Sequence, residues 1–164
     1  MESKKVEMEA QAEQVAARLT EPIPVILCGK TFEVGEKVTM LILPEIQVIH
    51  FINSLEDAKT NLGDLLAGRK PKSPSPNHIG THDYSKPPRA VVFGRAFDLA
   101  DVKELNRLHR GTGSGPVAWI AGDPAAIPPA QPGPGYAEKA AANVKKALAR
   151  WMDREGNDED IIYY

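Results

Sequence analysis

Short continuous apolar runs alternate along the chain with longer segments in which apolar residues recur every three or four positions. The first pattern is typical of strands buried on both faces of a sheet, and the second of amphipathic helices. The predicted strands are Val25–Cys28, Ile46–Ile52, Ala90–Phe93 and Val117–Ala121. The predicted helices are Val34–Leu43, Leu55–Leu66, Leu99–His109 and Tyr136–Arg154. This βα alternation predicts an α/β fold with a parallel sheet covered by helices on both faces.

Residues near the predicted helix ends support these boundaries. Ser54 precedes an apolar helical segment and is a plausible N-cap, Gly68 closes that helix, and Asp98 precedes the next one. Pro44 prevents the helix before it from continuing. The spacing places four leucine or valine side chains of the third helix on its inward face: Leu99, Val102, Leu105 and Leu108.

The two ends of the chain differ from the central βα pattern. Residues 1–21 are predicted to form an N-terminal helix with a thin apolar stripe, and 22–164 a single domain. The tail ends in Ile161–Tyr164, which is apolar and aromatic. Two interpretations stay open for this tail: a fifth, edge strand within the chain, or a contact that makes a homodimer.

The order of the strands decides where a ligand would lie. We expect 2-1-3-4, with a fifth strand at the edge, and 3-2-1-4 is the competing order. In both orders, ligands of such folds bind at the carboxyl ends of the strands. The turn Gly29–Gly35, which follows the first strand, is therefore the first place to look.

Two proline-rich segments interrupt the pattern, at 69–88 and 124–135. Connections of this length are either functional or mobile, and we predict that the first one screens the carboxyl edge of the sheet. It contains His78 and His82, four residues apart, which are two of the three protein ligands that a zinc site requires. A polar loop is the simpler interpretation, and a lid carrying His82, Asp83 and Tyr84 is another.

Composition narrows the possible partners. The net charge of −2 gives no general attraction to nucleic acid or to an anionic membrane. No apolar run approaches the roughly 20 residues that span a bilayer. The single cysteine, Cys28, lies in a predicted buried strand and is expected to be inert. We therefore expect a cytoplasmic protein with no nucleic-acid or membrane partner.

The turn Gly29-Lys-Thr-Phe-Glu-Val-Gly35 resembles the glycine-rich turn of NAD(P)-binding Rossmann domains. It is most similar to the G-x-x-G-x-x-G turn of the NmrA-like and extended short-chain dehydrogenase families, with Phe32 in the middle glycine position. The resemblance implies a three-layer α/β/α Rossmann-like fold and an NAD(P) cofactor. It would place the cofactor against Gly29, Lys30, Thr31, Phe32 and Gly35.

The ends of the second and third predicted strands complete the candidate ligand-binding residues. Asn53 and Ser54 stand where an acidic residue would hold the ribose of NAD, and they are uncharged. They would suit the phosphate of NADP if Lys30 or Arg69 lay nearby, or Ser54 is simply a helix cap. Gly94 and Arg95 follow the third strand, at the same edge of the sheet.

Other functional motifs are incomplete. Gly29-Lys30-Thr31 resembles the end of a P-loop, but the residues before it form a strand. A receiver domain has a similar order of strands, but Gly29-Lys30 and Gly94 stand where its acidic residues would lie. There is no Tyr-x-x-x-Lys pair and no Gly-x-Ser-x-Gly elbow, so whether the protein is an enzyme is left open. The sequence predicts a small nucleotide- or ligand-binding protein. The alternatives are a self-associating interaction module and an enzyme with its site under the proline-rich loop.

Overall fold

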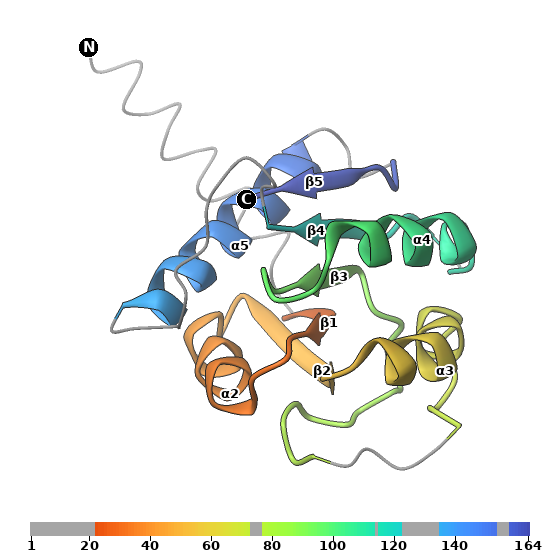
Figure 1. The fold of residues 1–164 in the computed structure, drawn as a ribbon, viewed down its shortest axis with the longest axis horizontal. Coiled ribbons are helices and arrows are strands. Elements are labelled where there is room, and N and C mark those ends of the chain that lie inside the picture. Colours follow the sequence, from red (N-terminus) through yellow and green to blue (C-terminus); the bar gives the residue numbers. More distant parts are fainter. Residues whose placement is uncertain (1–21, 73–76, 114, 123–134, 154–157) are drawn as a thin grey trace.

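The computed structural model describes residues 22–72, 77–113, 115–122, 135–153 and 158–164. In these residues five parallel strands form one sheet with the order β2-β1-β3-β4-β5 (Figure 1). The strands are β1 (Ile23–Cys28), β2 (Ile46–Ile52), β3 (Ala90–Phe93), β4 (Ala118–Ala121) and β5 (Ile161–Tyr163). The helices are α2 (Phe32–Leu41), α3 (Leu55–Leu66), α4 (Leu99–His109) and α5 (Tyr136–Asp153).

The helices form two layers, one on each face of the sheet. Helices α2 and α5 pack together on one face, and α3 and α4 pack together on the other. Successive strand residues point to opposite faces, so each central strand contributes to two separate cores. Val25 and Leu27 of β1 pack under α2 and α5, while Ile26 and Cys28 pack under α3 and α4. The fold is therefore a three-layer α/β/α Rossmann-like fold, as the alternating pattern predicts.

The predicted strand order is confirmed, including the fifth strand at the edge. Strand β1 lies between β2 and β3. The first crossover places β2 on one side of β1, and the second places β3 on the other side. The carboxyl ends of β1 and β3 are consequently the point where the direction of winding reverses. Residues 1–21, predicted to form a helix, lie outside the described residues.

Some predicted boundaries and faces are wrong. Helix α2 begins at Phe32, before the predicted start, and ends at Leu41, because Ile42 to Glu45 form a turn before β2. Leu108 of α4 is 51% exposed, although its spacing predicted an inward position. Asn106 is buried in its place and donates from Nδ2 to the carbonyl of Glu159 at 2.8 Å. The spacing of apolar residues could not predict that Asn106 is buried, because its hydrogen-bond partner lies in the C-terminal segment.

The described part of the proline-rich connection runs along the outer edge of β2. The amide groups of Thr81 and His82 donate to the carbonyls of Val48 and Ile49, both at 2.9 Å. Ile79 is buried against the same core as β2. The prediction that 69–88 screens the carboxyl edge of the sheet is thus wrong for this part. These residues instead satisfy the backbone groups that an edge strand leaves open.

Among the described residues, no helix is both long and apolar enough to cross a membrane.

Candidate functional site

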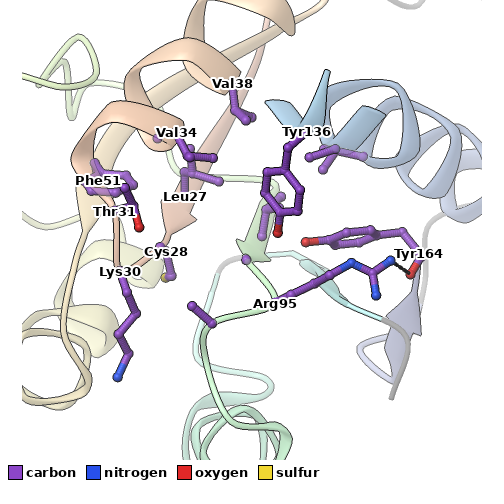
Figure 2. Close-up of a pocket in the computed structure, with 17 residues that line it drawn as sticks. Leu27, Cys28, Lys30, Thr31, Val34, Val38, Phe51, Arg95, Tyr136 and Tyr164 are labelled. Atoms are coloured by element: carbon purple, nitrogen blue, oxygen red, sulfur yellow. Dashed lines mark hydrogen bonds between the residues drawn. The ribbon is translucent and has the colours of Figure 1, made fainter. Parts of the chain in front are cut away.

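A cavity of about 80 Å3 lies at the carboxyl ends of β1 and β3, beneath the N-terminal ends of α2 and α5 (Figure 2). Two glycine turns form its edge. The amide of Gly29 donates to the carbonyl of Ile52 at 2.9 Å. The amide of Gly94 donates to the carbonyl of Cys28 at 2.8 Å. These bonds extend the parallel ladder by one residue and fix both turns on the sheet. The cavity therefore lies at the switch point where open α/β sheets bind their ligands.

The interior of the cavity is apolar. The cavity is lined by Leu27 and Val92 of the sheet, by Val34 and Val38 of α2, and by Val144 of α5. Val38, Val92 and Val144 are all buried, so their positions are fixed by packing. An interior of this kind favours an apolar group, because water gains few hydrogen bonds there.

Polar groups gather at the mouth. Lys30 and Thr31 come from the β1–α2 turn, Arg95 follows β3, Tyr136 opens α5, and Tyr164 follows β5. Figure 2 shows the rings of Tyr136 and Tyr164 reaching the same side of the cavity from different elements. Five residues from four separate parts of the chain thus provide hydrogen-bonding groups around one opening.

Tyr164 is held in place by several contacts. Its hydroxyl donates to the carbonyl of Phe93 at 2.9 Å, and its amide donates to the carbonyl of Ala121 at 3.0 Å. The guanidinium of Arg95 lies 5.3 Å from the ring centroid and donates to the main-chain oxygen of Tyr164 at 3.2 Å. Burial raises the pKa of Tyr164 to about 12, so the phenol keeps its proton at neutral pH.

The position of the Arg95 side chain requires glycine at residue 122. A Cβ on Gly122 would come within 2.6 Å of Arg95 Cγ, so the stem of Arg95 crosses a space that a side chain would fill. The Lys30 ammonium lies 5.1 Å from the centroid of Phe97, a cation–π contact at the surface.

The structure brings together most of the predicted site residues. Gly29, Lys30, Thr31 and Gly35 line the cavity from the β1–α2 turn, as do Gly94 and Arg95 from the other side. Gly35 is buried, and a Cβ there would lie 2.4 Å from Phe51 Cε2. This position requires glycine because the helix rests directly on the Phe51 ring.

Phe32, Asn53 and Ser54 are not among the residues that line the cavity. Phe32 is the first residue of α2, is 45% exposed, and its ring lies 5.9 Å from that of Phe51. Ser54 caps α3, since its hydroxyl accepts from the amide of Asp57 at 3.1 Å. The simpler interpretation of Ser54, as a helix cap, is confirmed.

The sequence does not indicate that Tyr136 and Tyr164 belong to the site. It predicts Tyr136 only as the start of a helix, and Tyr164 only as part of a terminal apolar run. The available signal was topological: a parallel fifth strand must end at the same edge as β1 and β3, which places the residue after it near the ligand site. Cys28 also lies at the cavity, and burial raises the pKa of its thiol, in agreement with the predicted inertness.

A second polar cluster lies away from the cavity, where the proline-rich connection meets β2. His50 is buried, and its Nδ1 lies 2.9 Å from the Tyr84 hydroxyl. The ring of His82 stacks on that of Tyr84 at 6.5 Å, and its Nε2 lies 3.1 Å from the carbonyl of Ile79. These side chains anchor the connection on the outer strand, so the predicted lid over the strand ends is wrong for them.

The two histidines of the proline-rich connection contact different neighbours. His78 is exposed and its Nε2 lies 3.5 Å from a carboxylate oxygen of Glu36, whereas His82 faces His50 and Tyr84. No group of three or more histidine, cysteine or acidic residues within the described ranges is arranged to hold a metal ion. The polar-loop interpretation of this segment is the one that its contacts support.

Comparison with known proteins gives one informative relative. No protein-family profile matches the chain, and no solved structure matches it. Kojic acid related protein 6 of Aspergillus oryzae is 32% identical over 143 residues, which cover 87% of this chain and 86% of that protein. The similarity thus extends over most of the length of both proteins. The chain therefore belongs to the family of Kojic acid related protein 6.

Proposed function

We propose that this protein binds a small molecule in the cavity between the carboxyl ends of β1 and β3. The observation that carries the proposal is the position of an apolar cavity at the switch point of the sheet, with polar groups only at its mouth. Small-molecule sites combine an apolar enclosure with a few hydrogen-bonding groups that fix orientation. The two glycine turns let a ligand approach the backbone at this edge.

The chemistry of the lining favours binding over catalysis. Among the described residues around the cavity, the reactive or polar side chains are two cations, two phenols, one threonine hydroxyl and the buried thiol of Cys28, and none is an aspartate, glutamate or histidine. A general acid–base reaction usually employs a histidine or a carboxyl group with a pKa near the working pH. Reversible binding needs no such group.

A dinucleotide such as NAD(P) is the second candidate ligand. The glycine turn before α2 supports it, because pyrophosphate binds at the N-terminal ends of helices in Rossmann domains. Phe32, in the middle position of that turn, would lie near the phosphates. Replacing Phe32 with glycine should therefore strengthen NADP binding if a dinucleotide is the ligand, and unchanged affinity would count against it.

The relative's name suggests one further compound for testing. Kojic acid is a small hydroxypyranone ring, and a ring edge is the kind of group that the apolar interior accepts. Kojic acid is therefore one of the compounds to be tested as a ligand, and the reason for choosing it is the name of the Aspergillus oryzae protein.

Thermal unfolding with candidate ligands tests the proposal. A molecule that binds only the folded state raises its stability, by about 2.7 kcal/mol when its concentration is a hundred times Kd. The panel comprises NAD, NADP, AMP, kojic acid and benzoate. We expect at least one compound to raise Tm in the unaltered protein, and Val34→Phe, which fills the cavity from α2, to abolish that rise.

Met40→Phe is the matched control for Val34→Phe. Met40 lies on the same helix, is 68% exposed and does not line the cavity. It should leave the ligand-induced rise unchanged. A rise in Tm that Val34→Phe and Met40→Phe affect equally would contradict binding in this cavity.

A further inference from the structure

We infer that the ligand is a small organic acid, whose apolar group enters the cavity and whose single anionic group lies at the mouth. The inference rests on the proposed function and adds the chemical class of the ligand. Three independent features of the described residues support it: the sign of the charges, the helix ends and the size of the apolar space.

The charged side chains that line the cavity have one sign. Lys30 and Arg95 line it, and no aspartate or glutamate among the described residues does. The acidic residues in the first turns of the two helices do not line the cavity: Glu33 is exposed, and Glu138 pairs with Lys37 at 3.6 Å. Because Arg95 already donates to the main-chain oxygen of Tyr164 at 3.2 Å, we assign to Lys30 the positive charge that a ligand would meet. It favours an anion over a neutral or cationic ligand.

Two helices begin at the same opening. Thr31 and Tyr136 lie at the starts of α2 and α5, and both line the cavity. The amide groups of a first helical turn have no partner within the helix, and the helix dipole places positive charge there. The Thr31 side chain makes no capping hydrogen bond to α2. An anionic group at the mouth would supply acceptors to these helix ends.

The apolar space limits the size of the ligand. The cavity measures about 80 Å3, roughly half the volume of an engineered protein cavity that takes up benzene. It can hold a short branched chain or one edge of a ring, with the remainder of the molecule at the open mouth. A phosphate or carboxylate could not enter this interior, because an unpaired charge among valines and leucines would lose its hydration.

The two tyrosines restrict where the anion sits. The Tyr164 hydroxyl already donates to the carbonyl of Phe93, which directs its proton away from a ligand. Tyr136 approaches the opening from the first turn of α5 (Figure 2). The anionic group is therefore expected between the Tyr136 side and the β1–α2 turn, where Lys30 would meet it by leaving its contact with Phe97, whose ring centroid lies 5.1 Å from the ammonium.

Matched pairs of acid and neutral compounds test this inference. The affinities of benzoate and benzamide are measured by isothermal titration calorimetry at low salt, on the unaltered protein and on Lys30→Gln, Lys30→Arg and Lys103→Gln. Lys103 is exposed on α4 and does not line the cavity. We expect benzoate to bind about tenfold more tightly than benzamide, because a hydrogen bond to a charged group is stronger than a neutral one. Lys30→Gln should remove most of that preference, Lys30→Arg should retain it, and Lys103→Gln should have no effect.

The possible results separate this inference from the proposed function. If benzamide binds as well as benzoate and Val34→Phe abolishes both, the cavity binds ligands but the inference about charge is wrong. If Lys30→Gln and Lys103→Gln weaken benzoate equally, the effect is one of general charge and the inference is also wrong. If no acid binds and NADP does, the ligand class is overturned while the cavity remains a ligand site. If no compound binds, both the inference and the proposed function are contradicted.

Discussion

At the scale of single residues, the contact between Gly35 and Phe51 determines how close α2 lies to the sheet. The Phe51 ring is fully buried and occupies the position that a side chain on residue 35 would need. Gly35→Val should destabilise the fold by about 1–3 kcal/mol through overpacking, although valine suits a helix better than glycine. Urea denaturation measures the change.

A double-mutant cycle identifies the cause of that loss. Phe51→Leu removes the atoms that approach residue 35, so the cost of Gly35→Val should be smaller in that background. Gly115→Ala is the control, because an added Cβ at residue 115 would meet nothing within 4 Å. Equal costs of Gly35→Val with and without Phe51→Leu would show that the ring contact is not responsible.

His50 makes the stability of the fold sensitive to acid. Burial lowers its pKa, with the Asp57 carboxylate acting in the opposite direction and His82 adding to the lowering. The folded state therefore keeps His50 neutral where the unfolded chain, with a pKa of about 6.5, already binds a proton. The resulting stability is present above about pH 6.5 and is lost as the pH falls toward the folded-state pKa.

His50→Gln should reduce this acid sensitivity. Between pH 7.5 and pH 5 the urea midpoint of the unaltered protein should fall further than that of the variant. His78→Gln, at an exposed histidine, should behave like the unaltered protein. An identical fall in all three proteins would show that His50 does not titrate between folded and unfolded states.

At the scale of elements, the sequence predicts the sheet and helices well because burial of βα units leaves a strong periodic signal. The ends of α2 and the inward face of α4 were less predictable. The turn Ile42 to Glu45 ends α2 before the apolar spacing does, and the inward face of α4 depends on the Glu159 carbonyl beside Asn106, a contact between distant parts of the chain. The same limitation explains why only part of the site can be predicted from the sequence. Gly29 to Gly35 form a local motif, whereas Tyr136 and Tyr164 reach the cavity only through the folded topology.

The segment before β5 is attached to the body of the protein mainly through Glu159. Its carboxylate accepts from the indole of buried Trp119 at 3.2 Å and from the amide of Gly111 at 2.9 Å. Glu159→Ala should cost about 1–3 kcal/mol, because a buried indole N–H would lose its partner. Asp160→Ala, which breaks only an exposed ion pair with Arg110, should cost less than about 1 kcal/mol. Similar losses of stability for the two variants would contradict this difference.

At the scale of the whole molecule, the tail docks within its own chain. Strand β5 pairs with β4, and the Asp158 carbonyl accepts from the indole of Trp151 at 2.7 Å. Deleting Asp158–Tyr164 should therefore lower Tm, since two buried indole N–H groups lose their partners. The homodimer remains a prediction, and light scattering on the full-length and truncated proteins tests it. If the truncated protein stays fully stable and the particle changes from dimer to monomer, the result favours the homodimer and contradicts the docked tail.

The central claim is that the cavity at the ends of β1 and β3 is the ligand site. The most direct measurement is a titration followed by 15N–1H NMR, with benzoate or another compound that raises Tm. The amide shifts that saturate with one common Kd should lie in the residues that line the opening, which are Gly29, Lys30, Thr31, Val34, Gly35, Gly94–Ala96, Tyr136 and Tyr164. Saturating shifts confined to His82 and Tyr84 on the outer edge of β2, or shifts scattered over the surface without saturation, would contradict it.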